Sequence, residues 1–283
     1  MPELPEVEVV RRGAEHWFVG RTIDRVEVLN PRAIRRHDAG EHDFIGQLVG
    51  TMILGAHRRG KYMWFSLDSG AVVIGHLGMS GQVLVHQGND QPNPHLRIRV
   101  SFTDSRDELW FVDQRTFGGM FVDEARSPVT GPDSLRHIAA DPLSPDFDLR
   151  ATVRRMRAKN SPVKAVILDQ TVVSGIGNIY ADESLWRARL HWQRPASGIP
   201  SGRLRELLEH SREVMTEALA QGGTSFDSLY VNVNGSSGYF SRSLAAYGRE
   251  GEPCLRCGTP LVREQFANRS SFRCPRCQRA ARG

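Results

Sequence analysis

The first residues of the chain combine a potential nucleophile with a carboxylate. If Met1 is removed, the nitrogen of Pro2 becomes a free secondary amine, the only one that a ribosomally made chain can offer. A secondary amine that attacks a sugar aldehyde carbon forms an iminium ion, a covalent electron sink of the Schiff-base type. Glu3 follows directly and can donate or accept a proton. The alternative is that proline and glutamate only open a helix, since both are common in a first turn.

All four cysteines lie near the C-terminus in two C-x-x-C pairs, which are Cys254 with Cys257 and Cys274 with Cys277. The pairs have the spacing of a four-cysteine zinc site. Four thiolates fill a tetrahedron and leave no open position, so we expect one structural zinc ion. For the chemistry of the chain we expect no catalytic metal or redox cofactor. Redox-active pairs or bare core cysteines are the alternative, but this short arginine-rich tail has little core of its own.

Two further segments have the chemistry of phosphate binding. Arg269 lies between the cysteine pairs in a predicted hairpin, and the planar fork of arginine suits phosphate. Gly175-Ile176-Gly177-Asn178 lies between two predicted helices, and the free N–H groups of a helix N-terminus bind anions. Asn178 can serve either as a phosphate contact or simply as a helix cap.

Composition indicates a globular protein of more than one domain. The chain has 283 residues, of which 40% are apolar, and a net charge of +5. No apolar run has the length of a membrane span and the acidic start is not a signal peptide, so we expect a cytoplasmic protein with no membrane partner. The positive charge suits a polyanion partner without identifying one.

The N-terminal half is predicted to be one helix followed by short strands. Apolar spacing predicts a helix from Pro5 to about Gly20, and a hairpin at Thr51–Arg58 and Lys61–Leu67 turns at Arg59-Gly60. Further strands are predicted at Ala71–Leu77, Gln82–His86, Leu96–Phe102, Leu109–Asp113 and Met120–Val122. Such a pattern favours a β-sandwich or flattened barrel.

Helical patterns follow a proline-punctuated segment from about Ala125 to Asp148. The first helix runs from near Phe147 to Lys159, and the later ones have predicted N-caps at Ser161, Asn178 and Ser201. The last helix carries an apolar stripe that we expect in the core, formed by Leu204, Leu207, Leu208, Met215 and Ala218. Gly222–Tyr239 is rich in glycine, serine and asparagine, as in a mobile loop or a loop that closes on a ligand.

The chain as a whole resembles the bacterial formamidopyrimidine-DNA glycosylases, which remove oxidised purines from DNA. The resemblance covers essentially the full length. It rests on eight motifs in family order: MPELPEVE at 1–8, RRGKY at 58–62, HLGMSG at 76–81, DQRTFGG at 113–119, SGIGNIYADESLW at 174–186, GGTSFDS to GYF at 222–240, YGREGEPC at 247–254 and NRSSFRCPRCQ at 268–278.

The resemblance implies a multidomain α+β fold. It consists of an N-terminal β-sandwich with flanking helices, then a helix–two-turn–helix domain, then a zinc finger with four cysteine ligands, with DNA in the cleft between the halves. The expected divisions are 1–124 for the catalytic sandwich, 125–148 for the linker, 149–250 for the helical domain with a lesion loop at 222–240, and 251–283 for the finger.

The resemblance also implies roles for individual residues. Pro2 is similar to the nucleophile that attacks C1′, and Glu3 to the acid and base that helps to open the sugar. Glu6 is similar to a glutamate that supports the N-terminus, and Lys61 to a lysine that contacts phosphate and assists elimination. Arg269 is implied in the last elimination as well as in phosphate binding, the role also implied for Asn178.

Other positions match residues that contact DNA around the lesion. His95 and Lys164 match residues that line the DNA cleft. Met79, Arg115 and Phe117 match residues that enter the double helix when the damaged nucleotide leaves it. Extrusion of a buried base costs a few kcal/mol, which apolar wedges and an arginine on the orphaned partner base help to offset.

The resemblance therefore predicts a monomeric base-excision-repair enzyme that acts on damaged double-stranded DNA in the bacterial cytoplasm, at the nucleoid. It removes 8-oxoguanine and formamidopyrimidines and then cuts the abasic strand by β- and δ-elimination. Two positions depart from the family pattern: Asn160, with Lys159 beside it, replaces a residue often basic in relatives, and Thr116 stands where some relatives carry a second arginine.

Two other functions remain open from the sequence. Endonuclease VIII-like glycosylases share the Pro2-Glu3 start and the zinc finger but prefer oxidised pyrimidines, whereas the PELPEVE start and the long 222–240 segment favour the purine class. A non-enzymatic zinc-finger DNA-binding protein would need the basic finger but no free Pro2 amine.

Overall fold

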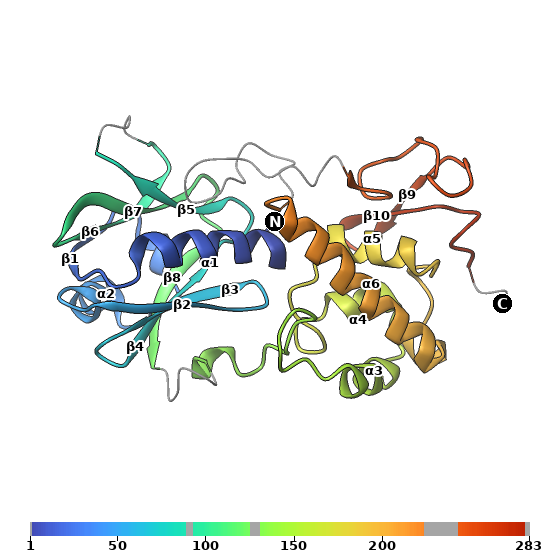
Figure 1. The fold of residues 1–283 in the computed structure, drawn as a ribbon, viewed down its shortest axis with the longest axis horizontal. Coiled ribbons are helices and arrows are strands. Elements are labelled where there is room, and N and C mark those ends of the chain that lie inside the picture. Colours follow the sequence, from blue (N-terminus) through green and yellow to red (C-terminus); the bar gives the residue numbers. More distant parts are fainter. Residues whose placement is uncertain (1, 89–92, 125–130, 224–242, 281–283) are drawn as a thin grey trace. The chain divides into compact units, whose positions relative to one another are not determined.

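The computed structural model describes residues 2–88, 93–124, 131–223 and 243–280 (Figure 1). These residues form two compact units. The first holds the described residues up to His137 together with 221–223, and the second holds residues 138–220 and 243–280.

The first unit is a β-sandwich with flanking helices, as predicted. Its helical elements are α1 (Leu4–Phe18), the 3-10 helix η1 (Pro31–Ile34), α2 (Gly40–Leu48) and the 3-10 helix η2 (Asp133–Leu135). Its strands are β1 (Ile23–Val28), β2 (Ile53–Arg59), β3 (Tyr62–Leu67), β4 (Ala71–His76), β5 (Gly81–His86), β6 (Leu96–Phe102), β7 (Ser105–Asp113) and β8 (Gly119–Glu124). The strands form two antiparallel sheets, in the orders β1-β6-β7-β5 and β2-β3-β4-β8.

The predicted hairpin is confirmed with its turn shifted by one residue. Arg59 pairs with Tyr62, so the two-residue turn is Gly60-Lys61 rather than Arg59-Gly60. Gly60 has φ 57°, a left-handed conformation that glycine adopts without a steric penalty. This register places Lys61 at the tip of the hairpin.

Helix α1 fastens the two sheets together. Its apolar residues Val7, Val10, Ala14 and Phe18 fall on one buried face, as the periodicity predicts. Phe18 stacks on Phe102 of β6 at 5.5 Å and meets Phe65 of β3 edge-on at 6.3 Å. Because one aromatic ring contacts both sheets, the helix that begins beside Pro2 is held by the core of the sandwich.

The second unit is mainly helical. It contains α3 (Leu149–Arg157), α4 (Val163–Leu168), α5 (Asn178–Arg187), the 3-10 helix η3 (Ala196–Gly198), α6 (Ser201–Ala220) and the hairpin of β9 (Val262–Phe266) with β10 (Arg269–Arg273). The predicted apolar stripe of α6 is buried throughout. No helix in the described part of the chain is long and apolar enough to cross a bilayer.

Three predicted N-caps are wrong by one residue. The cap of α4 is Pro162, not Ser161, because Pro162 is extended in a bridge with Pro195 and its carbonyl accepts from Val166. The cap of α5 is Gly177, and Asn178 is the first helical residue. Helix α6 begins at Ser201 itself. Local propensity hardly distinguishes between neighbouring residues as N-caps, and tertiary contacts decide which residue begins the helix.

The predicted lesion loop at 222–240 lies outside the described residues, apart from Gly222 and Gly223.

Candidate functional site

The N-terminal proline and glutamate lie at the start of α1. Pro2 is buried and Glu3 is 2% exposed. Glu3 is the N-cap of α1. Its backbone N–H donates to Glu6 Oε2 at 2.9 Å, and its side chain accepts from the backbone N–H of Glu6. This reciprocal capping box satisfies two N–H groups at the helix start. Pro2 lies just outside the helix, and Glu6 is hydrogen-bonded to Glu3, the residue that follows Pro2.

The chain enters the undescribed 224–242 segment beside this N-terminus. Gly223 has φ +85°, and a Cβ added to it would lie 3.4 Å from Glu6 Oε1. The left-handed backbone favours glycine at this position. The residue that leads into the segment therefore lies close to Glu6, in the first turn of α1.

An ion-pair network connects α1 to the hairpin that carries Lys61. Arg58 Nε donates to Glu8 Oε2 at 3.0 Å. The Arg11 guanidinium donates hydrogen bonds to the Glu8 carboxylate and to the carbonyl of Ala56. Burial raises the pKa of Glu8, but the surrounding guanidinium groups outweigh it and lower that pKa to about 2. Lys61, 7% exposed, thus sits on a hairpin anchored to the helix that begins at Glu3.

Replacing Glu8 with glutamine should destabilise the fold at neutral pH. The pKa of Glu8 in the folded state is about 2, below its usual 4.5. The contribution of Glu8 to the stability of the folded state is therefore complete above pH 4.5 and is lost as the pH falls toward 2. Allowing for solvent screening, we expect Glu8→Gln to cost about 1–2 kcal/mol at pH 7. Urea unfolding should show that the difference in free energy of unfolding between Glu8→Gln and the unmodified protein is smaller at pH 3 than at pH 7. An equal difference at both pH values would contradict the stabilising role of the ionised Glu8.

A histidine that sequence reasoning did not single out lies in the same cationic region. His76 ends β4, and its ring packs on Tyr62 at 4.6 Å. Burial, and then the charges of Arg36, Lys61 and Arg35, lower the pKa of His76 to about 4. Its Nδ1 accepts from the N–H of Gly78 at 3.2 Å, so the neutral ring carries its proton on Nε2. The HLGMSG motif, which begins at His76, was the available signal for this residue.

The three predicted wedge residues are carried by two loops that touch. Met79 lies in the β4–β5 loop, and Arg115 and Phe117 lie in the β7–β8 loop. A Cβ on Gly78 would lie 2.5 Å from the nitrogen of Gly118, so the loops meet backbone to backbone. Phe117 is 39% exposed although it is a large apolar residue, and the Arg115 guanidinium lies 5.4 Å from its ring centroid.

A buried aspartate organises the β7–β8 loop, residues 114–118, which we call the wedge loop. Asp113 is fully buried and accepts from Ser80 Oγ at 2.5 Å, from the N–H of Arg115 at 3.1 Å and from the N–H of Gly118 at 2.7 Å. The N–H of Asp113 donates to the carbonyl of His95 at 2.9 Å, which places this predicted cleft residue at the base of the same loop. One carboxylate therefore fixes both wedge-bearing loops relative to each other.

Lys164, predicted to line a DNA cleft, is engaged inside the second unit. It is 0% exposed, and its Nζ donates to Asp182 Oδ1 at 2.7 Å and to the carbonyl of Ser270 at 3.2 Å. Asp182 also accepts from Ser271 Oγ and from the N–H of Phe272. Burial raises the pKa of Asp182 to about 6 in spite of the lysine. In this structure the pair fastens β10 to α4 and α5 rather than presenting a charge at the surface.

Removing only one partner of this buried pair should be strongly destabilising. We expect Lys164→Met to cost about 3–5 kcal/mol, because it leaves the Asp182 carboxylate buried without a counter-charge. The double variant Lys164→Met with Asp182→Asn should lose less stability than the sum of the losses in the two single variants, because a neutral amide is buried at a lower free-energy cost than an unpaired carboxylate. Urea titration of the four proteins measures the coupling, and strict additivity would show that the pair is not coupled.

The two predicted phosphate residues lie close together in this unit. Asn178 Nδ2 donates to the carbonyl of Ser270 at 2.9 Å, and Arg269 is the exposed first residue of β10, next to Ser270 in the chain. Asn178 Oδ1 is buried and has no hydrogen-bond partner in the described part of the protein. The structure thus brings the start of α5 and the start of β10 together.

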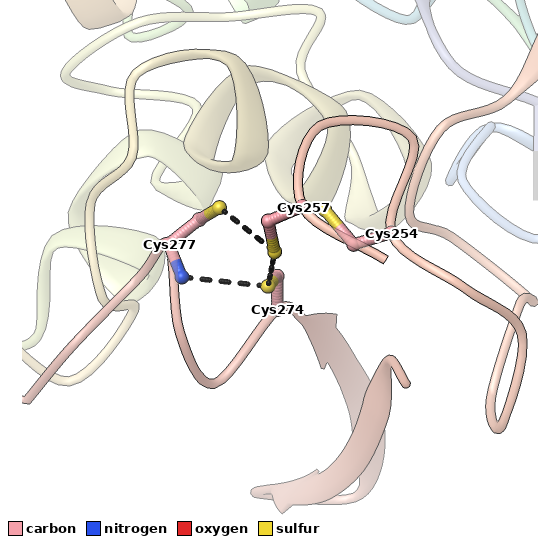
Figure 2. A group of neighbouring side chains, drawn as sticks. All are labelled: Cys254, Cys257, Cys274 and Cys277. Carbon is pink, nitrogen blue, oxygen red and sulfur yellow. Dashed lines mark hydrogen bonds between the residues drawn. The ribbon is translucent and has the colours of Figure 1, made fainter. Parts of the chain in front are cut away.

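The four cysteines converge at the other end of this hairpin (Figure 2). Their Sγ atoms all lie within 4.8 Å of one another, and those of Cys257 and Cys274 are 3.5 Å apart. A tetrahedral site of four sulfurs with zinc–sulfur bonds of about 2.3 Å needs S···S separations of about 3.8 Å, so the cluster fits this ion. Four thiolates leave no coordination position open, and the predicted structural zinc site is confirmed.

Helix α5 supports the zinc ligands from behind. Trp186 Nε1 donates to Cys254 Sγ at 3.4 Å, and the Arg256 guanidinium lies 3.7 Å from the Trp186 ring centroid. An N–H donor to a ligand sulfur orients that ligand. On the same helix, Glu183 accepts from three consecutive backbone N–H groups, those of Ala245, Ala246 and Tyr247. The helix that begins at Asn178 therefore holds both the finger and the segment leading to it.

Three family profiles cover most of the chain. Family profiles match three successive segments: the formamidopyrimidine-DNA glycosylase N-terminal domain at residues 1–120, the H2TH domain of the same enzymes at 138–229, and a zinc finger found in FPG and IleRS at 251–280. These intervals contain the sandwich, the helices and the cysteine cluster in turn.

Curated relatives and solved structures align over nearly the full length. Formamidopyrimidine-DNA glycosylases of Salinispora arenicola and Rhodococcus jostii are 57% and 59% identical, over 98% and 100% of this chain and 96% and 97% of theirs. The crystal structure of MutM (Fpg) from Thermus thermophilus superposes with a TM-score of 0.85 at 36% identity, covering 98% of both chains. The crystal structure of Lactococcus lactis Fpg in complex with abasic-site DNA superposes with a TM-score of 0.88 at 31% identity, covering 98% of this chain and 100% of that one. The chain belongs to the formamidopyrimidine-DNA glycosylase family.

Proposed function

We propose that this protein is a bifunctional DNA glycosylase and abasic-site lyase that removes oxidised purines from double-stranded DNA at the nucleoid. The observation that carries the proposal is the capping box at the N-terminus. It leaves Pro2 just outside α1, places Glu3 next to it and ties Glu3 to Glu6. Once Met1 is removed, this arrangement presents a secondary amine beside a carboxylate, in a chain whose relatives are glycosylases.

The base leaves in the first step. The lone pair of the Pro2 nitrogen forms a bond to C1′ of the extruded nucleotide, while the bond from C1′ to the base nitrogen breaks. The base takes that electron pair, and the amine proton is transferred to it. Glu3, as an acid, protonates the ring oxygen, so that the sugar opens and C1′ remains bound to proline as an iminium ion.

Two eliminations then cut the strand. The iminium acidifies the protons on C2′; loss of one expels the 3′ phosphate, and a second elimination expels the 5′ phosphate, leaving a one-nucleotide gap. We assign to Lys61 and Arg269 the stabilisation of the phosphate charge in these steps. The zinc ion takes no part in them and holds the hairpin that carries Arg269.

We also assign DNA contacts to individual residues of each unit. In the first unit, Lys61 and the Nε2–H of His76 can donate to phosphate, and His95 lines the base of the wedge loop. In the second unit we assign phosphate binding to Asn178 and Arg269. Met79, Arg115 and Phe117 fill the space that the extruded nucleotide leaves, with Arg115 on the orphaned base.

Base release from matched duplexes tests the proposal. Duplexes with one oxidised purine, one oxidised pyrimidine or one abasic site should be cleaved, and mass spectrometry should show that the purine lesion is released fastest. Faster release of the pyrimidine would indicate the endonuclease VIII-like specificity. Tight binding without base release would indicate a DNA-binding protein and contradict the proposal.

A further inference from the structure

Three consecutive carbonyl groups of the wedge loop point to one guanidinium group. Arg35, just after η1, donates through Nη2 to the carbonyl of Phe117 at 2.7 Å and through Nη1 to that of Gly118 at 2.8 Å, with the carbonyl of Thr116 at 3.4 Å. We propose that Arg35 is a positioning residue that holds the wedge loop ready for base displacement. This inference rests on the proposed function.

The loop conformation needs such a partner. Thr116 has φ 55°, a left-handed conformation that non-glycine residues rarely adopt, and the surrounding contacts must maintain it. Asp113 satisfies the N–H groups of Arg115 and Gly118 on one side of the loop, and Arg35 satisfies the carbonyls on the other. A cation also relieves the repulsion among carbonyl dipoles that converge on one point.

The arginine is itself fixed in place. Its Nη1 also donates to the carbonyl of Arg32 at 2.9 Å, at the start of the same short helix. That helix lies directly against β8: a Cβ on Gly119 would lie 2.4 Å from the carbonyl oxygen of Ala33. The guanidinium is therefore attached to a backbone in contact with the loop. Its planar fork presents donors on separate nitrogens in a fixed geometry, whereas the donors of lysine all lie on one nitrogen.

The consequence concerns Phe117 and Arg115. An exposed aromatic ring tends to fold back onto apolar surface unless its backbone is held, yet Phe117 stays 39% exposed. With both sides of the loop bonded, the ring and the neighbouring guanidinium are ordered before DNA arrives. The cost of ordering them is then not added to the cost of base extrusion.

The test compares Arg35→Gln and Arg35→Lys with the control Arg32→Gln. The control removes the same charge three residues earlier in the chain, within η1, and in the described part of the protein the Arg32 side chain makes no hydrogen bond to the wedge loop. Single-turnover base excision from an oxidised-purine duplex should fall about tenfold or more for both Arg35 variants. Strand cleavage at a preformed abasic site should change less than about threefold, because no base has to be displaced there. The control should resemble the unmodified protein on both substrates.

Amide hydrogen exchange of the free protein provides a second readout that does not depend on activity. Exchange at Arg115 and Gly118 should become faster in Arg35→Gln than in Arg32→Gln, because the loop loses its carbonyl partner. Equal losses on both DNA substrates would make Arg35 a direct phosphate contact, and unchanged exchange would show that it does not order the loop; either overturns the inference. If the unmodified protein excises no base, the proposed function fails, while the exchange result still decides the role of Arg35.

Discussion

A variant with Pro2→Gly should lose at least about a hundredfold in strand cleavage and in borohydride trapping on damaged duplex DNA. A secondary amine that condenses with C1′ can only give a charged iminium, because the nitrogen retains no proton to lose. The primary amine of glycine gives an imine that must stay protonated to act as an electron sink. Denaturing gels of the trapped adduct, with mass spectrometry of the N-terminal peptide, measure the effect.

The control for this experiment is Pro5→Ala, which removes another buried proline of the same segment and leaves Pro2 free. It should retain trapping. A protein with an uncleaved N-terminal extension should bind DNA but form no adduct, whereas the same extension at the C-terminus should be tolerated. An adduct that maps to a lysine, or persists with a blocked N-terminus, would refute the role of Pro2.

Removal of zinc should unfold the finger and abolish tight DNA binding. Structural zinc contributes on the order of 10 kcal/mol or more to such modules, as much as the whole stability of many domains. Cys274 directly follows β10, so the metal holds the end of the hairpin that carries Arg269, in addition to the contacts of that hairpin with α4 and α5. We expect Cys274→Ser or treatment with a strong chelator to lower DNA affinity by at least about a hundredfold through loss of that hairpin.

Tryptophan fluorescence can follow this change directly. Trp186 Nε1 donates a hydrogen bond to Cys254 Sγ, and Trp192 Nε1 donates to Glu264 of β9 at 2.6 Å. Both indoles should therefore change environment when zinc is removed. A double Trp186→Phe and Trp192→Phe variant should bind zinc but lose most of the fluorescence change. Zinc-free protein that keeps its DNA affinity would show that the finger is not required for binding.

Features that depend on neighbours in the chain were predictable from the sequence. The C-x-x-C spacing predicted the zinc site because each pair chelates locally, and the apolar periodicity of α1 and α6 predicted their buried faces. The same holds for the hairpin around Gly60, since turn chemistry and strand alternation are local. The resemblance then supplied the reaction, which no single motif would have identified.

Features that depend on residues far apart in the chain were not predictable in this way. From its neighbours in the chain Asn178 is a helix cap, but the structure shows that it donates to the carbonyl of Ser270 in β10. The sequence of α4 does not show that Lys164 is paired with Asp182. His76 is an ordinary strand residue until burial and three neighbouring cations lower its pKa. These outcomes are set by desolvation and by interactions between residues that lie far apart in the chain, such as Lys164 and Asp182, which local propensity does not describe.

The sequence by itself predicted the metal site and the alternation of strands and helices, because each follows from residue type and short-range spacing. It also supplied the Pro2-Glu3 pair to which we assign the chemistry. Only the tertiary structure decided which polar groups are buried, which charges are paired and which backbone groups are held. The wedge loop shows the difference: the motif DQRTFGG supplies its residues, but Asp113 and Arg35 order it only once η1, β7 and β8 are packed together.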